Sequence, residues 1–342
     1  MMHDQQKVLC IGSMGKDIFF PIDPTQLPHD AHCSDTQAKW FRFAYGSKIH
    51  VEDRFSALGG CACNVSVGLS RLGISASACG NVGNDAEGRW ITEFLKNARV
   101  FTEKIRTVDD AKTDLSMILV DSTIGERTIF VNRDVGEKLV INAQDISGEQ
   151  WCYMGSLYGE HIQENMRVVH RALVEQSVKL AYNPGGSNIA HDTDVVLDLI
   201  HHAYVVFVNR SEARDIVAQF NLPHNVDDQH DETFLTHTIK QHMKSDNGVV
   251  VLTDGRNGAW AYNGEYIVHT EVIEKKVCDA TGAGDAFASG FFAGFLQGFS
   301  VEKCMQWGSA NSDAVIDYYG AQEGLLLYDI IEERSQTFVV KK

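Results

Sequence analysis

The chain of 342 residues is 44% hydrophobic and 22% charged, fractions that are typical of folded globular proteins and that exclude a disordered or collagen-like chain. Its 46 acidic residues exceed its 30 basic residues and give a formal charge of -16, so we expect neither a nucleic-acid partner nor an anionic membrane surface. No apolar run has the length of a membrane-spanning helix and no secretory signal pattern is present, so we expect a cytoplasmic protein.

Short apolar runs alternate with amphipathic stretches along the chain. The runs have the composition of buried parallel strands and lie at 7–12, 75–80, 151–155, 178–183, 204–209 and 248–253. Helical patterns lie between several of them, at 62–72, 85–98, 160–176, 192–201 and 211–220. This alternation predicts an α/β fold of three layers, with a central, mostly parallel sheet that is flanked by helices. In such folds ligands bind at the carboxyl ends of the strands.

Two segments, about 17–58 and 113–135, depart from this alternation. The second contains two β-type runs around a turn at Gly125, which indicates a hairpin without a crossover helix. We expect both segments to form a small β-sheet lid that excludes water from the ligand, with two ordinary surface hairpins as the alternative. The aromatic residues at 40–45 would form a face of this lid or a contact between the subunits of a homodimer.

The segment DATGAGDAF, residues 279–287, predicts an anion site with a carboxylate beside it. Gly282, Ala283 and Gly284 precede a long helical pattern, and backbone amides at a helix N-terminus attract negative charge. A helix cap would explain Asp285 alone but not the small residues before it. The pattern favours a base that accepts a hydroxyl proton while the amides stabilise a transferring phosphoryl group. We expect the helix end to keep this carboxylate ionised at neutral pH.

A second segment, residues 58–73, begins with Gly59 and Gly60 before an amphipathic helical pattern. Paired glycines let the backbone approach a ligand closely, although such pairs also mark plain turns. Asn64 offers a donor and an acceptor, which recognition of a sugar diol requires. Asp17 follows the first predicted strand, and with these residues it predicts the binding site of the acceptor.

Both segments resemble the two signature sequences of the ribokinase, or PfkB, family of carbohydrate kinases. The resemblance extends to further family markers at 11–17, 80–88, 209–212, 252–260 and 319–322. It implies a single kinase domain over residues 1–342, with a ribokinase-like fold and the lid described above. It also implies an enzyme that transfers a phosphoryl group from ATP to an alcohol.

The resemblance assigns a role to each matching position. Asp285 corresponds to the catalytic base, and Gly282, Ala283 and Gly284 correspond to the anion hole. The positions that correspond to the acceptor site are Asp17, Gly59, Gly60 and Asn64. The positions that correspond to the nucleotide site are Asn209, Glu212, Thr253, Gly255, Thr281 and Asn311.

The same resemblance implies metal ions at two positions. Glu212 corresponds to the residue that organises Mg2+, through water, and Mg2+ characteristically keeps several water ligands. Asp279, Thr281 and the backbone near Gly320 correspond to a loop that holds a monovalent cation, often K+, in many family members.

The predicted reaction is ATP-dependent phosphorylation of a hydroxymethyl group on a small sugar or sugar derivative, either fructose-like, ribose-like or a keto-deoxy sugar acid. Ribose is not singled out, because Met154-Gly155-Ser156 stands where ribokinases carry Gln-Leu-Glu. Arg127 and Arg133 could reach a ligand carboxylate or phosphate from the lid, although exposed arginines are commonly solvated.

Other functions stay open to different degrees. A nucleoside kinase of the same family is the alternative, and it would need an apolar shelf for the base, for which Phe19, Phe20, Phe41 and Phe130 are available. A noncatalytic sugar sensor would have little use for Asp285 beside an anion hole. A P-loop kinase and a dinucleotide-binding oxidoreductase are disfavoured, because the chain lacks their glycine motifs at the required positions.

Overall fold

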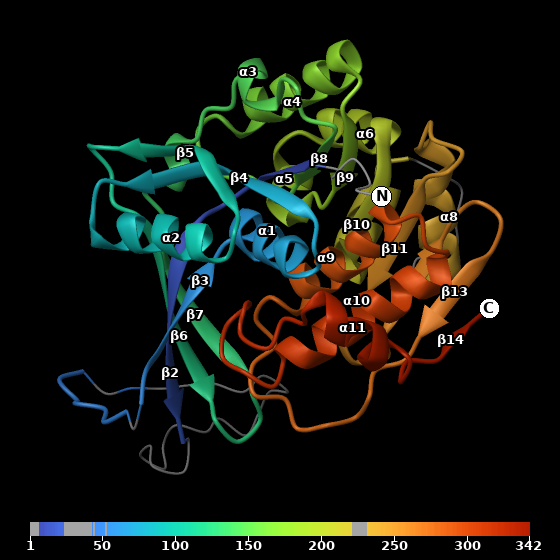
Figure 1. Ribbon diagram of the computed structural model, residues 1–342. Coiled ribbons are helices and arrows are strands. Elements are labelled where there is room, and N and C mark those ends of the chain that lie inside the picture. The colour runs from blue at the N-terminus through green and yellow to red at the C-terminus, as the bar shows by residue number, and fades with distance from the viewer. Residues whose placement is uncertain (1–6, 24–42, 44, 52, 221–230) are drawn as a thin grey trace.

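The structure is a computed structural model that describes residues 7–23, 43, 45–51, 53–220 and 231–342 (Figure 1). Within these residues the chain forms a ten-stranded sheet, in the order β14-β13-β12-β11-β10-β9-β8-β1-β4-β5, and a four-stranded sheet, in the order β3-β2-β6-β7. The smaller sheet extends away from the body of the molecule at the lower left of Figure 1. None of the described helices is both long and apolar enough to cross a membrane.

The parallel part of the larger sheet contains the strands that the apolar runs predict. Its members are β1 (Lys7–Ile11), β4 (Ser75–Gly83), β5 (Phe101–Val108), β8 (Trp151–Met154), β9 (Lys179–Tyr182), β10 (Ala203–Asn209) and β11 (Val249–Thr253). All except β5 coincide with a predicted run. The central strands are almost continuously apolar because both of their faces are covered.

Alternate residues of β1 show how helices cover the two faces. Val8 and Cys10 belong to a core with one set of helices, whereas Leu9 and Ile11 belong to a core with another set. The first face carries α1 (Cys61–Arg71), α9 (Ala283–Leu296), α10 (Val301–Val315) and α11 (Tyr328–Ser335), with α2 (Ala86–Asn97) beside α1. The second face carries α3 (Ala143–Ile146), α4 (Ile162–Gln176), α5 (Gly185–His191), α6 (Thr193–His202), α7 (Arg210–Ala218) and α8 (Glu232–His242). The predicted three-layer arrangement is confirmed.

The edges of the larger sheet lie outside the sequence prediction. At one edge β12 (Ala259–Tyr262), β13 (Ile267–Thr270) and β14 (Val340–Lys341) add in antiparallel orientation. At the other edge β5 carries Glu103, Lys104 and Arg106, charges that are compatible with an edge strand but hide its apolar pattern.

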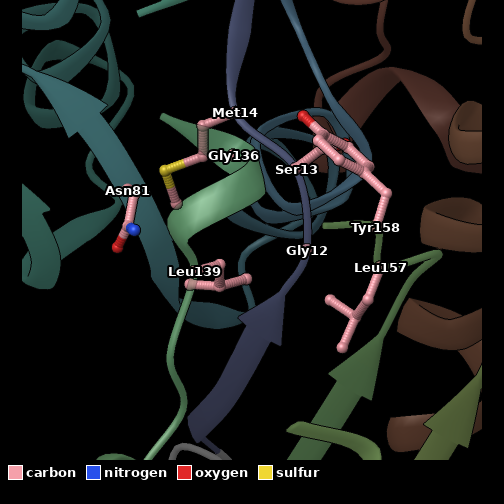
Figure 2. Close-up of a pocket in the computed structure, with 8 residues that line it drawn as sticks. All are labelled: Gly12, Ser13, Met14, Asn81, Gly136, Leu139, Leu157 and Tyr158. Atoms are coloured by element: carbon pink, nitrogen blue, oxygen red, sulfur yellow. The ribbon is translucent and has the colours of Figure 1, made fainter. Parts of the chain in front are cut away.

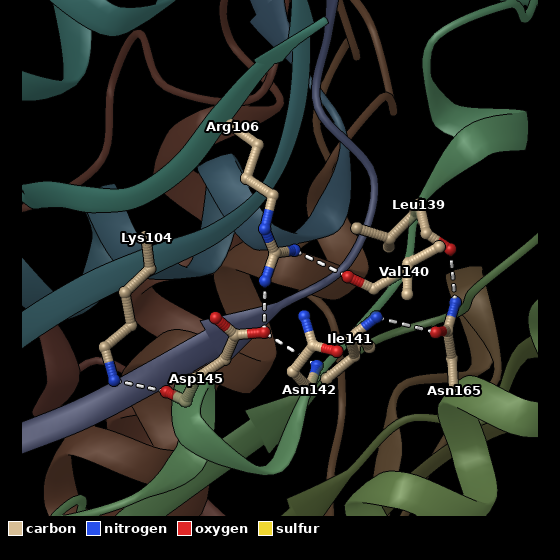
Figure 3. Close-up of polar contacts among 8 residues, drawn as sticks. All are labelled: Lys104, Arg106, Leu139, Val140, Ile141, Asn142, Asp145 and Asn165. Atoms are coloured by element: carbon tan, nitrogen blue, oxygen red, sulfur yellow. Dashed lines mark hydrogen bonds and ion pairs between the residues drawn. The ribbon is translucent and has the colours of Figure 1, made fainter.

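Two basic residues of β5 anchor the chain where it returns from the smaller sheet (Figure 3). Lys104 donates to the carbonyl oxygen of Asp145, and Arg106 donates to the carbonyl oxygen of Val140 at 2.6 Å and pairs with the Asp145 carboxylate. Asn165 of α4 bonds to two further backbone groups of the same connection, at 2.7 and 2.8 Å. The charges at this edge therefore hold the connection between the two sheets in place.

The smaller sheet is the predicted lid. It consists of β2 (Gly15–Ile22), β3 (Phe55–Gly59), β6 (Asp114–Asp121) and β7 (Arg127–Asn132). β2 pairs with β3 in antiparallel orientation and with β6 in parallel orientation, and β6 pairs with β7 as a hairpin. The segments 17–58 and 113–135 therefore share one mixed sheet, and the alternative of two separate surface hairpins is wrong.

Strand register shows which side chains of the lid face the body. Residues that lie opposite one another on neighbouring strands share a face. One row across the lid is Ala57, Asp17, Ser116 and Val131, and the next row on the same face is Phe55, Phe19, Ile118 and Ile129. The ring of Tyr319, from the body, stacks on Phe55 with a centroid distance of 4.7 Å. The face that carries Asp17 is therefore the face that contacts the body.

Part of the aromatic stretch 40–45 can be located. Trp40, Phe41 and residue 44 lie outside the described residues. Phe43 and Tyr45 are exposed, and Phe43 lines an open apolar groove of about 290 Å³ on the far face of the lid, together with Phe20 and Met117. The homodimer contact that the sequence suggests stays a prediction.

The approach of the lid to the body predicts a glycine requirement at residue 320. Gly320 has a φ of +88°, and a Cβ atom there would lie 2.4 Å from the Cβ atom of Ala57 in the lid. Gly320→Ala should therefore lower the free energy of unfolding by about 1–3 kcal/mol, measured by denaturant titration. Gly186→Ala on α5 is the matched control, because a Cβ atom there would meet nothing within 4 Å. Equal unfolding midpoints for the two variants would show that the lid yields at this contact.

Candidate active site

The N-terminus of α9 opens toward solvent at the carboxyl ends of the strands. Gly282 is the N-cap, with a φ of 75°, and a Cβ atom there would lie 2.1 Å from the Cβ atom of Ala321, so only glycine fits. Gly284 is exposed, and a Cβ atom there would meet nothing within 4 Å. The amide of Ala283 bonds to the carbonyl oxygen of Ala280 at 3.3 Å. The open end of this first turn therefore lies at Gly284.

Asp285 is half-buried in this first turn. Its carboxylate accepts a hydrogen bond of 2.7 Å from the Nδ2 atom of Asn64 on α1. Burial raises the pKa of Asp285, while the hydrogen bond from Asn64 lowers it. Desolvation is the larger of the two effects, and the expectation that the helix end keeps this carboxylate ionised at neutral pH stays a prediction. A raised pKa makes the carboxylate a better proton acceptor.

The side-chain amide of Asn64 is engaged by two protein groups. The residue is only 6% exposed, its Nδ2 atom donates to Asp285, and its Oδ1 atom accepts from the Nε2 atom of Gln322. The amide therefore holds the carboxylate of Asp285, and the expected contact with the acceptor stays a prediction. Gln322 lies in the family marker 319–322, but nothing local in the sequence connects it to α1, so its contact with Asn64 could not be predicted.

The two glycines before α1 make room for neighbouring groups. A Cβ atom on Gly59 would lie 2.6 Å from a carboxylate oxygen of Asp17. Gly60 has a φ of +92°, and a Cβ atom there would lie 2.2 Å from the carbonyl oxygen of Ser13. The glycine pair therefore lets the carboxylate of Asp17 and the backbone of Ser13 pack closely against the residues that precede α1.

Asp17 has an unusual ionisation for an aspartate. Burial raises its pKa to about 6; a hydrogen bond from Ser116 opposes this effect and the negative charge of Asp279 adds to it. The thiol of Cys63, in the first turn of α1, is influenced by the charges of both Asp17 and Asp285. The first turn of α1 thus has a carboxylate from the lid and a carboxylate from α9 near it.

A small cavity lies beside these groups, at the ends of β1 and β4 (Figure 2). Its volume of about 10 Å³ suits one water molecule or one ligand hydroxyl. The lining residues are Gly12, Ser13, Met14, Asn81, Gly136, Leu139, Leu157 and Tyr158. The Oδ1 atom of Asn81 is buried and has no hydrogen-bond partner among the residues that the structure describes. Tyr158 donates its hydroxyl hydrogen to Asp114, and the guanidinium group of Arg133 lies 3.9 Å from the centre of its ring.

The expected nucleotide residues lie at the ends of two adjacent strands. Asn209 and Thr253 are opposite one another in the register of β10 and β11. Asn209 and Glu212 form a capping box on α7, with two hydrogen bonds of 2.9 Å. Gly255 follows in a short turn, with a φ of +50° and free space where a side chain would stand.

The capping box leaves Glu212 able to act on a metal ion. Only its Oε2 atom is used by the backbone amide of Asn209. Burial raises the pKa of Glu212, so the half-buried carboxylate would gain from a nearby positive charge. Carboxylate oxygen is a donor that Mg2+ prefers, and Mg2+ commonly binds with one or two carboxylates and the phosphates of a substrate. No group of three or more metal-binding side chains occurs within the described ranges.

Asp279, Thr281 and Gly320 come together as the sequence predicts. Asp279 is fully buried and accepts hydrogen bonds from the amide and hydroxyl groups of Thr281, at 3.0 and 2.8 Å, and from the amide of Gly320, at 3.1 Å. All of these donors are neutral. In the part of the chain that the structure describes, no basic side chain pairs with Asp279. A buried carboxylate without a cationic partner fits a monovalent cation.

Asn311 does not contribute its side chain to the nucleotide site. It is 0% exposed, and its amide bonds to the carbonyl oxygen of Ala286, the hydroxyl group of Ser289 and the backbone amide of Leu326. The expected nucleotide contact is therefore corrected. Asn311 joins α10 to α9 and supports the helix that carries Asp285.

The sequence matches the family model of the pfkB family carbohydrate kinases over residues 32–326. A nucleoside kinase of Methanocaldococcus jannaschii is 22% identical over 96% of this chain and 96% of the relative. Its crystal structure aligns with a TM-score of 0.74 and covers 97% of this chain and 98% of that chain. An ATP-dependent 6-phosphofructokinase of Thermoanaerobacterium thermosaccharolyticum is 26% identical over 81% of this chain and 84% of the relative.

A structure of Arabidopsis thaliana ribokinase complexed with ribose and ATP shares the fold. It aligns with a TM-score of 0.73 at 18% identity, and covers 97% of this chain and 99% of that chain. The ribokinase-like fold is therefore confirmed, and the chain belongs to the pfkB family of carbohydrate kinases, which are phosphotransferases with an alcohol group as acceptor.

Proposed function

We propose that the protein transfers the γ-phosphoryl group of ATP to a hydroxymethyl group of a small sugar or sugar derivative. One observation carries this proposal: the carboxylate of Asp285 is half-buried in the first turn of α9, next to the open backbone of Gly284. Its raised pKa suits a general base. The ribose and ATP bound by the similar Arabidopsis enzyme support the choice of both substrates.

In this proposal each group has one task. Asp285 accepts the proton of the acceptor hydroxyl group as its oxygen attacks the γ-phosphorus atom, and the adenosine diphosphate leaves. Backbone amides at the start of α9 stabilise the charge on the phosphoryl oxygens. Asp17 accepts hydrogen bonds from other hydroxyl groups of the acceptor and fixes its orientation. The lid then excludes water, which would otherwise compete as the acceptor.

The nucleotide and its ions would bind on the other side of the anion site. Asn209, Glu212, Thr253 and Gly255 lie at strand ends where a triphosphate can approach. Mg2+, held near Glu212, would supply positive charge to the phosphate groups. K+ at Asp279 would balance the buried carboxylate there.

A nucleoside is the second candidate acceptor, and one feature of the lid favours it. Ile129 and Val131 are 47% and 53% exposed on the face that carries Asp17, so they could cover a base. The aromatic residues named from the sequence do not serve this purpose, because Phe19 is fully buried and Phe20 and Phe130 lie on the opposite face. Phe41 lies outside the described residues.

An acceptor screen decides between these substrates. ADP release is measured with ribose, fructose, keto-deoxy sugar acids, phosphosugars and nucleosides, each with and without K+. We expect turnover of at least one polyhydroxylated compound that has a free hydroxymethyl group. Selective turnover of nucleosides would favour the second candidate, and ATP hydrolysis without any phosphorylated product would contradict both.

Removal of the proposed base should abolish most of the chemistry. We expect Asp285→Asn to lower kcat by about 10²- to 10⁴-fold, with little change in the KM for ATP, because a positioned base contributes that much to proton transfer. Asp329→Asn, the same change in the first turn of α11, should leave kcat unchanged, since Asp329 is exposed. A kcat of Asp285→Asn near that of the wild type would remove Asp285 from the reaction.

Binding of the acceptor should depend on pH through Asp17. The pKa of Asp17 is about 6, so the side chain is a carboxylate above this pH and a neutral acid below it. The KM for the acceptor should therefore rise as the pH falls below 6, by at most about tenfold per pH unit. In Asp17→Asn the KM should be high and nearly independent of pH. If the variant kept the wild-type pH dependence, another group would have to be responsible.

A further inference from the structure

Residues 319–322, which follow α10, contact the lid and both helices of the active site. Tyr319 stacks on Phe55 of the lid at 4.7 Å and contacts Phe19 with a centroid distance of 5.9 Å. Phe19 is fully buried, and Tyr319 packs against the small apolar cluster that it forms with Ile118. The position of the Tyr319 ring therefore depends on the position of the lid.

The next two residues contact the loop before α9. The amide of Gly320 donates to Asp279, and Ala321 lies so close to Gly282 that a side chain at the N-cap of α9 has no room. Ala321 is itself buried. A displacement of Tyr319 would therefore be transmitted to the first turn of α9 through direct contacts.

Gln322 completes the segment with a polar contact to α1. Its side chain is 3% exposed and donates from Nε2 to the Oδ1 atom of Asn64, which in turn donates from Nδ2 to the carboxylate of Asp285. The direction of these two hydrogen bonds is fixed by Asp285, because an ionised carboxylate can only accept. Asn64 must turn its NH2 group toward Asp285, so Gln322 must present its own NH2 group to Asn64.

We propose that Gln322 is a positioning residue, which orients the amide of Asn64 and thereby the carboxylate of Asp285, on a segment that the lid holds in place through Tyr319. This inference rests on the proposed function of Asp285. It adds that closure of the lid on the acceptor and alignment of the base are one mechanical event, since one short segment contacts the lid at Tyr319 and the helices that hold the base at Ala321 and Gln322.

Gln322→Glu would reverse the direction of the hydrogen bond between residue 322 and Asn64. Its carboxylate would attract the NH2 group of Asn64 and turn the Oδ1 atom of Asn64 toward Asp285, where two acceptors would face each other. A methionine of similar length would remove the donor without adding charge, and would leave the buried Oδ1 atom of Asn64 unpaired. Asp285 should then lose its orientation in both variants, and more severely in Gln322→Glu.

The groups that surround Asp285 allow its titration to report on the hydrogen bonds from Gln322 to Asn64 and from Asn64 to Asp285. The other titratable groups near it are the thiols of Cys61 and Cys63 on α1 and the hydroxyl group of Tyr153 on β8. Burial raises the pKa of each of these groups, so they stay protonated and neutral around neutral pH. Asp17 is the further carboxylate near the first turn of α1.

The first test compares kinetic constants of Gln322→Glu and Gln322→Met with those of the wild type. We expect kcat to fall by about tenfold in the Met variant and about 100-fold in the Glu variant, while both KM values stay within about threefold. Gln336→Glu, the same change at an exposed position, should behave as the wild type. A kcat of Gln322→Met within twofold of the wild type would overturn the proposal, as would equal losses in kcat and in nucleotide affinity.

The second test does not need catalytic activity. The carboxyl groups of 13C-labelled aspartates are titrated by NMR, and the Asp285 signal is assigned by its loss in Asp285→Asn. The titration midpoint of Asp285 should move to higher pH in both Gln322 variants and stay unchanged in Gln336→Glu. An unchanged midpoint in Gln322→Met would overturn the proposal even if the wild type showed no kinase activity, whereas a shifted midpoint in an inactive wild type would overturn the proposed function alone.

The third test addresses the contribution of the lid. Phe55→Ala removes the ring that Tyr319 stacks on without touching Asp285. Its effect on kcat should be smaller when Gln322 has already been replaced by Met than in the wild type, because both changes loosen the same segment. Independent, additive effects would show that lid position and base alignment are not coupled through residues 319–322. If Gln322→Glu does not fold, Gln322→Met alone is used in all three tests.

Discussion

The close approach of α1 and α9 is the constraint on which the candidate site depends. Asn64 reaches Asp285 at 2.7 Å, and one turn further along both helices a Cβ atom on Gly68 would lie 2.3 Å from the hydroxyl oxygen of Ser289. Any side chain at residue 68 would separate the helices and break the hydrogen bond. Asn311 adds to the constraint, because its amide bonds to the same hydroxyl group of Ser289 and joins α10 to α9. The position of the carboxylate is thus set by helix packing.

This constraint explains why the sequence predicts some features of the site and misassigns others. The glycines at 282 and 284 predict the open first turn of α9 because their effect is local, on one end of one helix. Asn64 and Asn311 also correspond to family positions, but their partners are more than 20 residues away in the chain, at Asp285 and at Ser289. The sequence predicts a ligand for each amide, whereas tertiary packing gives each one a protein partner.

The elements of the fold also divide into those that the local sequence predicts and those that depend on distant partners. The central strands could be predicted because burial on both faces demands continuous apolar runs. The edge strand β5 could not, because its lysine and arginine serve the connection at residues 140–145 and mask its pattern. The lid could be predicted as extended segments, but not the parallel pairing of β2 with β6, which joins segments about 100 residues apart. That pairing is what places Asp17 and Ser116 side by side.

The net negative charge of the chain also bears on the candidate site. An acidic protein that binds a triphosphate needs local positive charge, yet Arg210, which begins α7 beside the expected nucleotide residues, is already paired with Glu232 and Asp254. Asp279 and Asp285 have only neutral hydrogen-bond donors within the described chain. Backbone amides at the start of α9 supply part of the positive potential. In the function proposed above, metal ions that arrive with the nucleotide would supply further positive charge near the acidic side chains at the strand ends.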